Sequence, residues 1–157
     1  MCNHLHIPLQ SGSDKVLKAM QRRYKTSLYA SVVEKVINRI PDAGIGVDVI
    51  VGFPGETEED FLATHNFIRE LPVSYLHVFT YSERPDTKAV SIEGKVDVAE
   101  RKRRNHILRI LSEKKRKEFY SSMEGKSLDV LFEGENIDGE IKGFASNYVR
   151  VALPFNS

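Results

Sequence analysis

The stretch VDVIVGFPGETEED, residues 47–60, decides the fold of this chain, because an apolar, β-branched run passes directly into a loop rich in Gly and acidic residues. Two other stretches repeat this order of apolar run and polar loop: HLHIPLQSGSD at residues 4–14 and YLHVFTYSERP at residues 75–85. Segments of helical character separate the three. The alternation predicts parallel strands joined by helical crossovers, and in such sheets the loops at the carboxyl ends of the strands form the ligand site.

Capping and breaking residues set the expected elements of this first part. Ser13 and Thr57 are expected N-caps, and acidic residues follow Thr57 in the first turn of its helix, where the helix dipole favours them. Thr26 or Ser27 is expected to cap the second helix. The sequence predicts strands at 3–9, 46–51 and 75–81, helices at 14–20, 28–40 and from 57 to about 71, and an irregular loop at 82–96.

The composition changes after residue 97. Residues 98–122 read as one long helix, with apolar side chains at helical spacing and basic side chains crowding the other faces. This basic face has two interpretations, a solvated surface with pairing to nearby glutamates or a stripe that faces phosphates. Three short β-like runs follow at 127–132, 140–142 and 148–153, and they predict a small antiparallel barrel.

These changes divide the chain into residues 1–96, a basic linker helix at 97–123, and a small β domain at 124–157. Three parallel strands are too few for a barrel of about eight, and three hairpin strands fall short of a five-stranded barrel. We therefore expect a part of a larger enzyme that lacks N-terminal domains of the same polypeptide. Unpaired strand edges would make artefactual self-association a hazard.

The bulk composition excludes several classes of protein. Hydrophobic residues make up 41% of the chain, which is enough for a core, and no apolar run approaches the roughly 20 residues of a membrane span. The single cysteine, Cys2, excludes an internal disulfide and suits a reducing compartment. We expect a cytoplasmic protein without membrane contact.

The predicted strands each have one aliphatic face and one polar or aromatic face, because side chains alternate along a strand. Gln10 and Asp48 fall on the second kind of face, where they need polar partners, and this favours a lumen that holds a polar ligand over a fully packed core. Asp48 also has a structural interpretation, as a carboxylate bound to backbone amides. His4 and His6, on the same face, could together with Asp48 begin the metal site of a hydrolase, although a further ligand is lacking.

At these residues the chain resembles the radical-SAM methylthiotransferases. Residues 9–24 are similar to the fourth-strand segment of the family, residues 48–60 to its fifth-strand signature, and residues 81–87 to its sixth-strand motif, with Asp86 in place of the usual Gly. The long helix and residues 125–151 resemble its linker and the start of its RNA-binding TRAM domain. The resemblance implies an α/β fold: the C-terminal half of a radical-SAM (β/α) partial TIM barrel, followed by a truncated all-β TRAM barrel.

The resemblance also implies a function. Residues 77–79 and 147–151 are most similar to family members that add a methylthio group to N6-threonylcarbamoyladenosine in the tRNA anticodon loop; members that act on isopentenyladenosine, or a non-catalytic RNA-binding module, are the alternatives. The family uses S-adenosylmethionine (SAM) and two 4Fe–4S clusters. The family's cluster-binding Cys-x-x-x-Cys-x-x-Cys loop is absent from this sequence, and Cys2 alone cannot hold such a cluster. We therefore expect no metal site here and no activity of this chain by itself.

The resemblance assigns roles by position. Gln10 should contact the ribose or methionine part of SAM, Arg22 its carboxylate, and Asp48 the ribose hydroxyls. The full set expected to bind the cofactor is Gln10, Ser11, Arg22, Asp48, Gly52, Phe79, Thr80 and Tyr81. The set expected to contact tRNA is Arg101, Lys102, Arg104, Lys115, Lys117 and Lys126.

Overall fold

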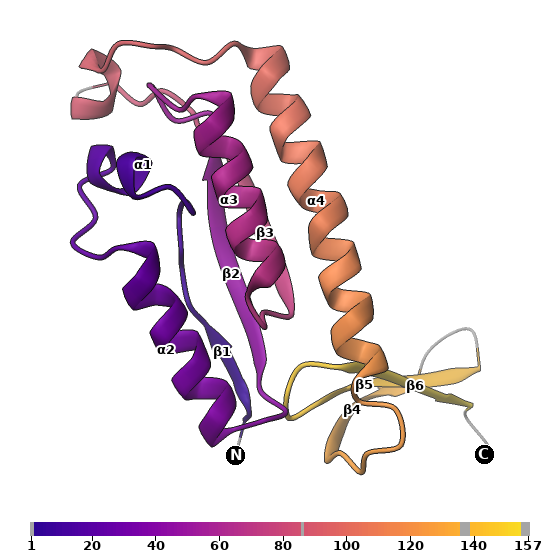
Figure 1. The fold of residues 1–157 in the computed structure, drawn as a ribbon. Coiled ribbons are helices and arrows are strands. Elements are labelled where there is room, and N and C mark those ends of the chain that lie inside the picture. The colour runs from indigo at the N-terminus through magenta and orange to yellow at the C-terminus, as the bar shows by residue number, and fades with distance from the viewer. Residues whose placement is uncertain (1, 86, 136–138, 155–157) are drawn as a thin grey trace.

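The computed structural model describes residues 2–85, 87–135 and 139–154, which form a three-stranded parallel sheet and a three-stranded antiparallel sheet (Figure 1). The first unit alternates strand and helix, as the sequence predicts. Its elements are β1 (His4–His6), α1 (Asp14–Ala19), α2 (Thr26–Arg39), β2 (Gly44–Val51), α3 (Glu58–Glu70) and β3 (Tyr75–Thr80). After a 3-10 turn at Lys88–Ser91 come α4 (Val98–Ser121), β4 (Val130–Glu135), β5 (Glu140–Ala145) and β6 (Arg150–Pro154).

The parallel sheet has the order β1-β2-β3, with both pairs parallel. Strand β1 is shorter than predicted, because Pro8 has no amide hydrogen for the ladder and the amides of Leu9 and Gln10 both donate to the carbonyl of Asp48. Pairing resumes at one isolated bridge between Gln10 and Val49. Strand β2 begins at Gly44, two residues earlier than predicted.

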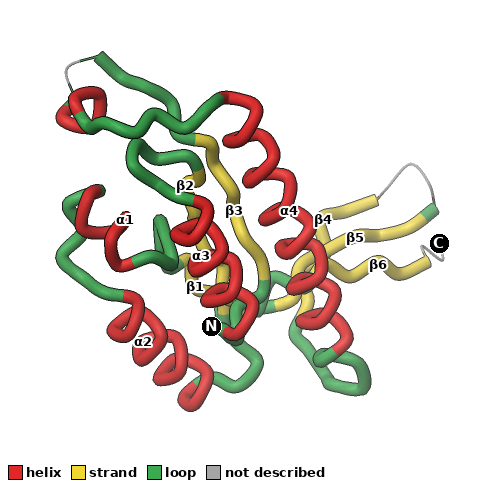
Figure 2. Tube along the Cα trace, turned by 45° about the horizontal axis from the view of Figure 1, so that its top comes forward, coloured by secondary structure: helices red, strands yellow, loops and turns green. Residues whose placement is uncertain are grey.

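One face of the parallel sheet carries the core, and helices α2, α3 and α4 cover it (Figures 1 and 2). The predicted aliphatic faces are the buried ones, since Val47, Val49 and Val51 of β2 are at most 1% exposed. Burying each such side chain contributes roughly 1.5–3 kcal/mol. The helices contribute Tyr29, Val33, Phe61, Ile68, Leu108 and Leu111 to this core.

The predicted caps have mixed outcomes. The Ser13 hydroxyl accepts a hydrogen bond from the Val16 amide, and Thr57 forms a reciprocal capping box with Asp60, so both predictions are confirmed. The cap predicted for the second helix is wrong. Helix α2 starts at Thr26, and the Thr26 amide is bound instead by a carboxylate oxygen of Asp14, 2.8 Å away, in the preceding helix.

Helix α4 runs beside β3 along the free edge of the parallel sheet and continues to the antiparallel sheet (Figure 2). The Ser112 hydroxyl accepts from the Leu76 amide at 2.8 Å and donates to the Leu76 carbonyl at 3.0 Å, and Asn105 donates to the Val78 carbonyl. Side chains of α4 thus occupy the backbone groups of an edge that would otherwise be open to another strand. No helix in the described ranges combines the length and the apolar character needed to cross a bilayer.

The antiparallel sheet has the order β4-β5-β6 and adjoins the amino end of the parallel sheet. All three strands end later than predicted, and β4 and β6 also begin later, whereas β5 begins at the predicted residue 140. Strand β4 covers 130–135 in place of 127–132, with a register irregularity between Phe132 and Glu135. The turn between β5 and β6 makes the contact with the parallel unit, where the Asn3 amide donates to the Ser146 carbonyl at 2.7 Å.

Candidate functional site

A cleft of about 360 Å³ opens at the carboxyl ends of the parallel strands, which is the edge the sequence predicts for the ligand. Its walls come from the end of α1, from β2 and the loop after it, from the end of β3, and from the 3-10 turn. The cations Arg22 and Lys88 share this cleft with Ile50, Phe53 and Tyr81. Apolar walls with a few convergent polar groups are typical of small-molecule sites, and this set suits a ligand with a flat ring and an anionic group.

The Tyr81 side chain carries the most informative polar atom of the cleft. Its ring is held edge-on by Phe53, with centroids 5.3 Å apart, and by the Arg101 guanidinium, 5.4 Å from the ring centroid. Its hydroxyl is buried and has no hydrogen-bond partner among the described residues. Leaving such a group unpaired costs about 1–3 kcal/mol, so Tyr81 is a residue of the cleft whose side chain would gain from a partner outside the described residues.

Gln10 adopts a strained backbone conformation, with φ of 73°. Its amide donates to the Asp48 carbonyl at 2.8 Å and its carbonyl accepts from the Ile50 amide at 2.9 Å, so the sheet fixes this conformation. For a non-glycine residue the left-handed region costs of order 1–3 kcal/mol, and such strain clusters at ligand sites. The neighbouring Ser11 is only 1% exposed, and its hydroxyl lies 3.2 Å from the Thr64 hydroxyl, so Ser11 joins the loop to α3.

Asp48 lies on the polar face of the sheet, next to the imidazoles of His6 and His77. Its carboxylate is 2.9 Å from Nε2 of His6, and His77 is opposite it in the β2–β3 register. His4 has another partner, the Tyr75 hydroxyl at 2.8 Å, and burial, followed by the charges of His6 and His77, lowers the pKa of His4. Within the described residues no group of three or more His, Cys, Asp or Glu is arranged to hold a metal ion, so the geometry does not favour the metal-hydrolase alternative.

The remaining residues predicted to bind the cofactor are distributed unevenly. Arg22 enters the cleft after a left-handed turn at Gln21, φ 57°, which ends α1. Phe79 is 52% exposed on the polar face, in register with Ile50. Thr80 pairs with the buried Val51, so its side chain leaves that face.

Two arginines of α4, Arg101 and Arg104, are buried behind the cleft and support it. The sequence predicts that both contact tRNA. Arg101 donates to the Tyr81 carbonyl and the Val96 carbonyl, each at 2.9 Å, and to the Glu83 carboxylate at 2.8 Å. It also packs against Gly52, where an added Cβ would lie 2.3 Å from the Arg101 side chain. Arg101 thereby joins the loops that follow β2 and β3.

Arg104 makes a buried ion pair with Glu56 at 2.6 Å, and both side chains are at most 5% exposed. The other Glu56 carboxylate oxygen accepts from the Gly52 amide at 3.1 Å, which fixes the turn at the end of β2. Burial raises the pKa of Glu56, while the hydrogen bonds from Arg104 and Gly52 act in the opposite direction. Glu56 directly after the Pro54-Gly55 turn is the sequence signal that could have indicated a buried partner on α4.

The six residues predicted to contact RNA fall into two groups. Arg101, Arg104 and Lys115 are buried, and Lys115 donates to the Leu71 carbonyl at 2.6 Å. A cation whose donors are directed at groups inside the protein is not available to a phosphate, so the structure does not favour RNA contact for these three. The exposed members of the set are Lys102, Lys117 and Lys126, of which Lys126 pairs with Asp42.

Comparison with known families agrees with this geometry. Residues 1–68 match the family model described as the Radical SAM superfamily. The similarity to this superfamily therefore covers the part of the chain from β1 through most of α3.

Individual proteins of similar sequence indicate a narrower class than the superfamily. It is 46% identical, over 85% of its length, to the threonylcarbamoyladenosine tRNA methylthiotransferase MtaB of Aquifex aeolicus, and 42% identical, over 96%, to the MtaB of Bacillus subtilis. It is 43% identical, over 94%, to the tRNA-2-methylthio-N(6)-dimethylallyladenosine synthase of Endomicrobium trichonymphae. The aligned region makes up 32%, 34% and 35% of these three proteins, so the chain spans about a third of their length. It is thus a homologue of part of the MtaB methylthiotransferases and of part of the tRNA-2-methylthio-N(6)-dimethylallyladenosine synthases.

Proposed function

We propose that this chain forms the SAM-binding half of the barrel of a radical-SAM tRNA methylthiotransferase, together with a linker helix and the first strands of an RNA-binding TRAM barrel. The proposal includes the domain boundaries expected from the sequence, one between residues 96 and 97 and one between residues 123 and 124. The observation that carries it is Tyr81, which lines a cleft together with Arg22 and Lys88 and whose buried hydroxyl has no partner among the described residues. A nucleoside with an amino-acid tail offers the ring and the carboxylate that such a cleft would bind.

The chain's own residues bind and orient the cofactor in this proposal. Arg22 holds the carboxylate, since charge-assisted hydrogen bonds are the strong ones. The Tyr81 hydroxyl donates a hydrogen bond to the ligand, and the left-handed backbone at Gln10 fixes the orientation of that residue. Asp48 accepts hydrogen bonds from ribose hydroxyls, competing with His6 for the same carboxylate. SAM supplies a methyl group and, with electrons from clusters held by other parts of the full-length enzyme, a radical.

The proposed substrate is N6-threonylcarbamoyladenosine of tRNA, and N6-isopentenyladenosine (dimethylallyladenosine) is the alternative. Relatives named for either nucleoside are similar to this chain to nearly the same degree, 46% and 43%. The full-length protein should therefore be supplied with tRNA carrying one or the other modification. The mass of the released nucleosides then identifies the substrate, and no methylthio product from either tRNA would contradict the proposal.

The cofactor site has a direct test in this chain, with two tyrosines that differ in one respect. Tyr81→Phe removes a buried hydroxyl that has no partner in the part of the chain that the structure describes, whereas Tyr29→Phe removes one that donates to the Ile7 carbonyl at 2.6 Å. We expect Tyr81→Phe to leave the free chain as stable or more stable and to weaken SAM binding about tenfold. Tyr29→Phe should lower stability by about 1 kcal/mol and leave SAM affinity unchanged.

Calorimetric titration with SAM and urea unfolding measure the two quantities. Equal SAM affinity in the wild type and Tyr81→Phe would contradict the assigned role of the hydroxyl. A wild-type chain that does not bind SAM would contradict the proposed site.

A further inference from the structure

A second hollow runs along the outer side of β3, away from the cleft at the strand ends. It consists of two adjoining cavities of about 340 and 410 Å³, which share His77 and Arg116. The first lies between β3 and α4, and the second continues to the antiparallel sheet, where Phe144, Tyr148 and Arg150 line it. We call this continuous hollow the β3–α4 groove. It connects the two sheets.

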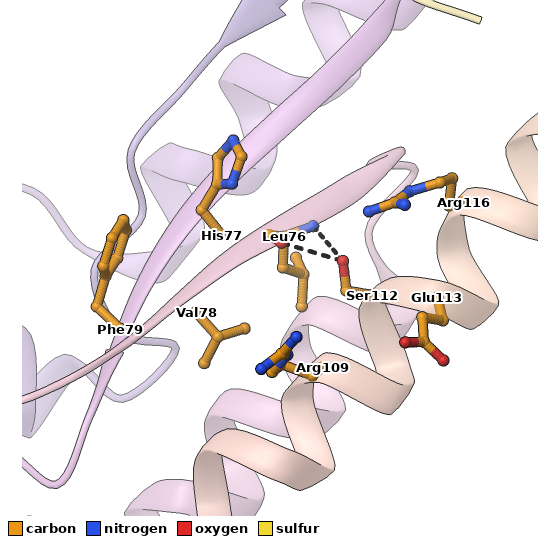
Figure 3. A pocket seen from close by; sticks show the side chains of 8 residues that line it. All are labelled: Leu76, His77, Val78, Phe79, Arg109, Ser112, Glu113 and Arg116. Atoms are coloured by element: carbon orange, nitrogen blue, oxygen red, sulfur yellow. Dashed lines mark hydrogen bonds between the residues drawn. The ribbon is translucent and has the colours of Figure 1, made fainter. Parts of the chain in front are cut away.

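Three arginines line the β3–α4 groove, and none of them forms an ion pair within the described residues. Arg109 and Arg116 reach from α4 toward β3, as Figure 3 shows, and Arg150 extends from β6. None of the three has a carboxylate within 4.0 Å among the residues described, although Glu113 also lines the groove. This contrasts with Arg101 and Arg104, whose partners are carboxylates of the same chain. The groove thus has a net positive lining suited to anions.

Aromatic rings lie at the end of the groove next to the antiparallel sheet. Tyr148 is 52% exposed, stacks on His4 with centroids 4.2 Å apart, and lies 5.6 Å from the ring of Phe144. The Arg150 guanidinium lies over Phe144, 5.2 Å from its centroid. Accessible rings, here the exposed Tyr148 and the partly buried Phe144, next to guanidinium groups without a carboxylate partner in the described ranges are a combination with which proteins bind single-stranded nucleic acid, because bases stack on the rings and cations contact phosphates.

We propose that the β3–α4 groove binds an unpaired segment of an RNA strand. Bases stack on Phe144 and Tyr148, and phosphates contact Arg109 and Arg116. These two arginines are seven residues apart on α4, which places them about 10 Å apart along the helix axis on nearly the same face. The inference rests on the proposed function, which makes RNA the partner, and it assigns residues outside the set derived from the sequence.

The test is a fluorescence anisotropy titration of the 157-residue chain with a labelled single-stranded 12-nucleotide RNA. Arg109→Gln/Arg116→Gln should bind at least about tenfold more weakly, and its log affinity should fall less steeply with log salt, by about 0.7 for each phosphate that is no longer bound. Phe144→Leu should bind about five- to tenfold more weakly with an unchanged salt slope. Arg39→Gln is the matched control, since Arg39 is an exposed arginine at the end of α2 without a carboxylate partner in the described ranges.

Several results would overturn the inference. The double arginine variant could bind like Arg39→Gln, the same RNA annealed to its complement could bind equally well, or polyglutamate could compete as well as RNA. Urea unfolding of each variant guards against misfolding, and Arg109 and Arg116 are exposed, so their replacement should leave the midpoint unchanged. A wild-type chain that binds no single-stranded RNA would also overturn it. The proposed function is judged separately, by SAM affinity and by the mass of the modified nucleoside.

Discussion

The two ends of the parallel sheet are finished in opposite ways. At the carboxyl end a cleft stays open, with a strained residue at Gln10 and, at Tyr81, a hydroxyl that no described residue pairs with. At the amino end the turn between β5 and β6 fills the space, and Asn147 at its centre is 1% exposed. The difference teaches that the buried hydroxyl without a partner among the described residues lies at the end where a ligand is expected, whereas left-handed backbone occurs at both ends, at Gln10 and at Tyr148.

The amino end satisfies its polar groups within the chain. The Asn147 amide nitrogen donates to the Asp42 carbonyl at 3.0 Å, and its side-chain oxygen accepts from the Val149 amide at 3.3 Å. Gly44 makes this close approach possible, since a Cβ there would lie 2.2 Å from the Asn147 carbonyl oxygen. The antiparallel sheet is therefore joined to the parallel unit by specific hydrogen bonds and close packing.

The largest expected effect is at the carboxyl end. Arg104→Gln leaves the Glu56 carboxylate buried without its cation, and breaking such a pair costs about 3–5 kcal/mol of unfolding free energy. Arg103→Gln is the control on the same helix, because Arg103 is 47% exposed and its solvent-screened pairs with Glu58 and Glu100 should contribute far less than the buried pair. Urea unfolding measures both. Equal losses would mean that burial does not distinguish the two arginines.

A substitution at the amino end of the parallel sheet should lower the free energy of unfolding by less. Asn147→Ala removes the hydrogen bonds to Asp42 and Val149 and should cost about 1–3 kcal/mol, because buried partners lose their bonds. Amide hydrogen exchange should speed up in β5 and at Gly44 while β3 stays protected. Asn66→Ala, on the exposed side of α3, is the control that should change neither quantity. Faster exchange throughout both sheets would show that the two units unfold as one.

The smallest effect concerns acid stability at the carboxyl end. Burial acts to raise the pKa of Asp60, but hydrogen bonds from Lys15, Thr57 and Ser13 outweigh it and lower the pKa to about 2 from a usual 3.8. A lowered carboxyl pKa stabilises the fold above about pH 4, and this stabilisation is lost as the pH falls toward 2. Because Lys15 is exposed, we expect about 1–2 kcal/mol.

Asp60→Asn should therefore abolish this part of the pH dependence. The measurement is the urea midpoint at several pH values from 2 to 5. A variant that loses stability with acid as steeply as the wild type would show that Asp60 is not the source.

The sequence by itself determined the order and type of the elements. Local signals were enough for this: the alternation of apolar residues, the breaking residues, and the caps at Ser13 and Thr57. It also determined which face of each strand is aliphatic, because side-chain direction alternates along a strand whatever it packs against. The end of the sheet that holds the candidate cleft followed from parallel connectivity.

Only the tertiary structure decided what the charged residues of α4 do. In sequence, Arg101 and Arg104 look like their exposed basic neighbours. The burial of Arg104 depends on Glu56, 48 residues earlier, and the burial of Arg101 depends on the loop that carries Glu83. The cap of α2 likewise came from Asp14 in another helix. The tertiary structure also decided that the Tyr81 hydroxyl has no hydrogen-bond partner among the described residues. It likewise brought Arg109, Arg116 and Arg150 together along one groove. Partners distant in sequence are fixed by packing, and local patterns do not encode which distant groups that packing brings together.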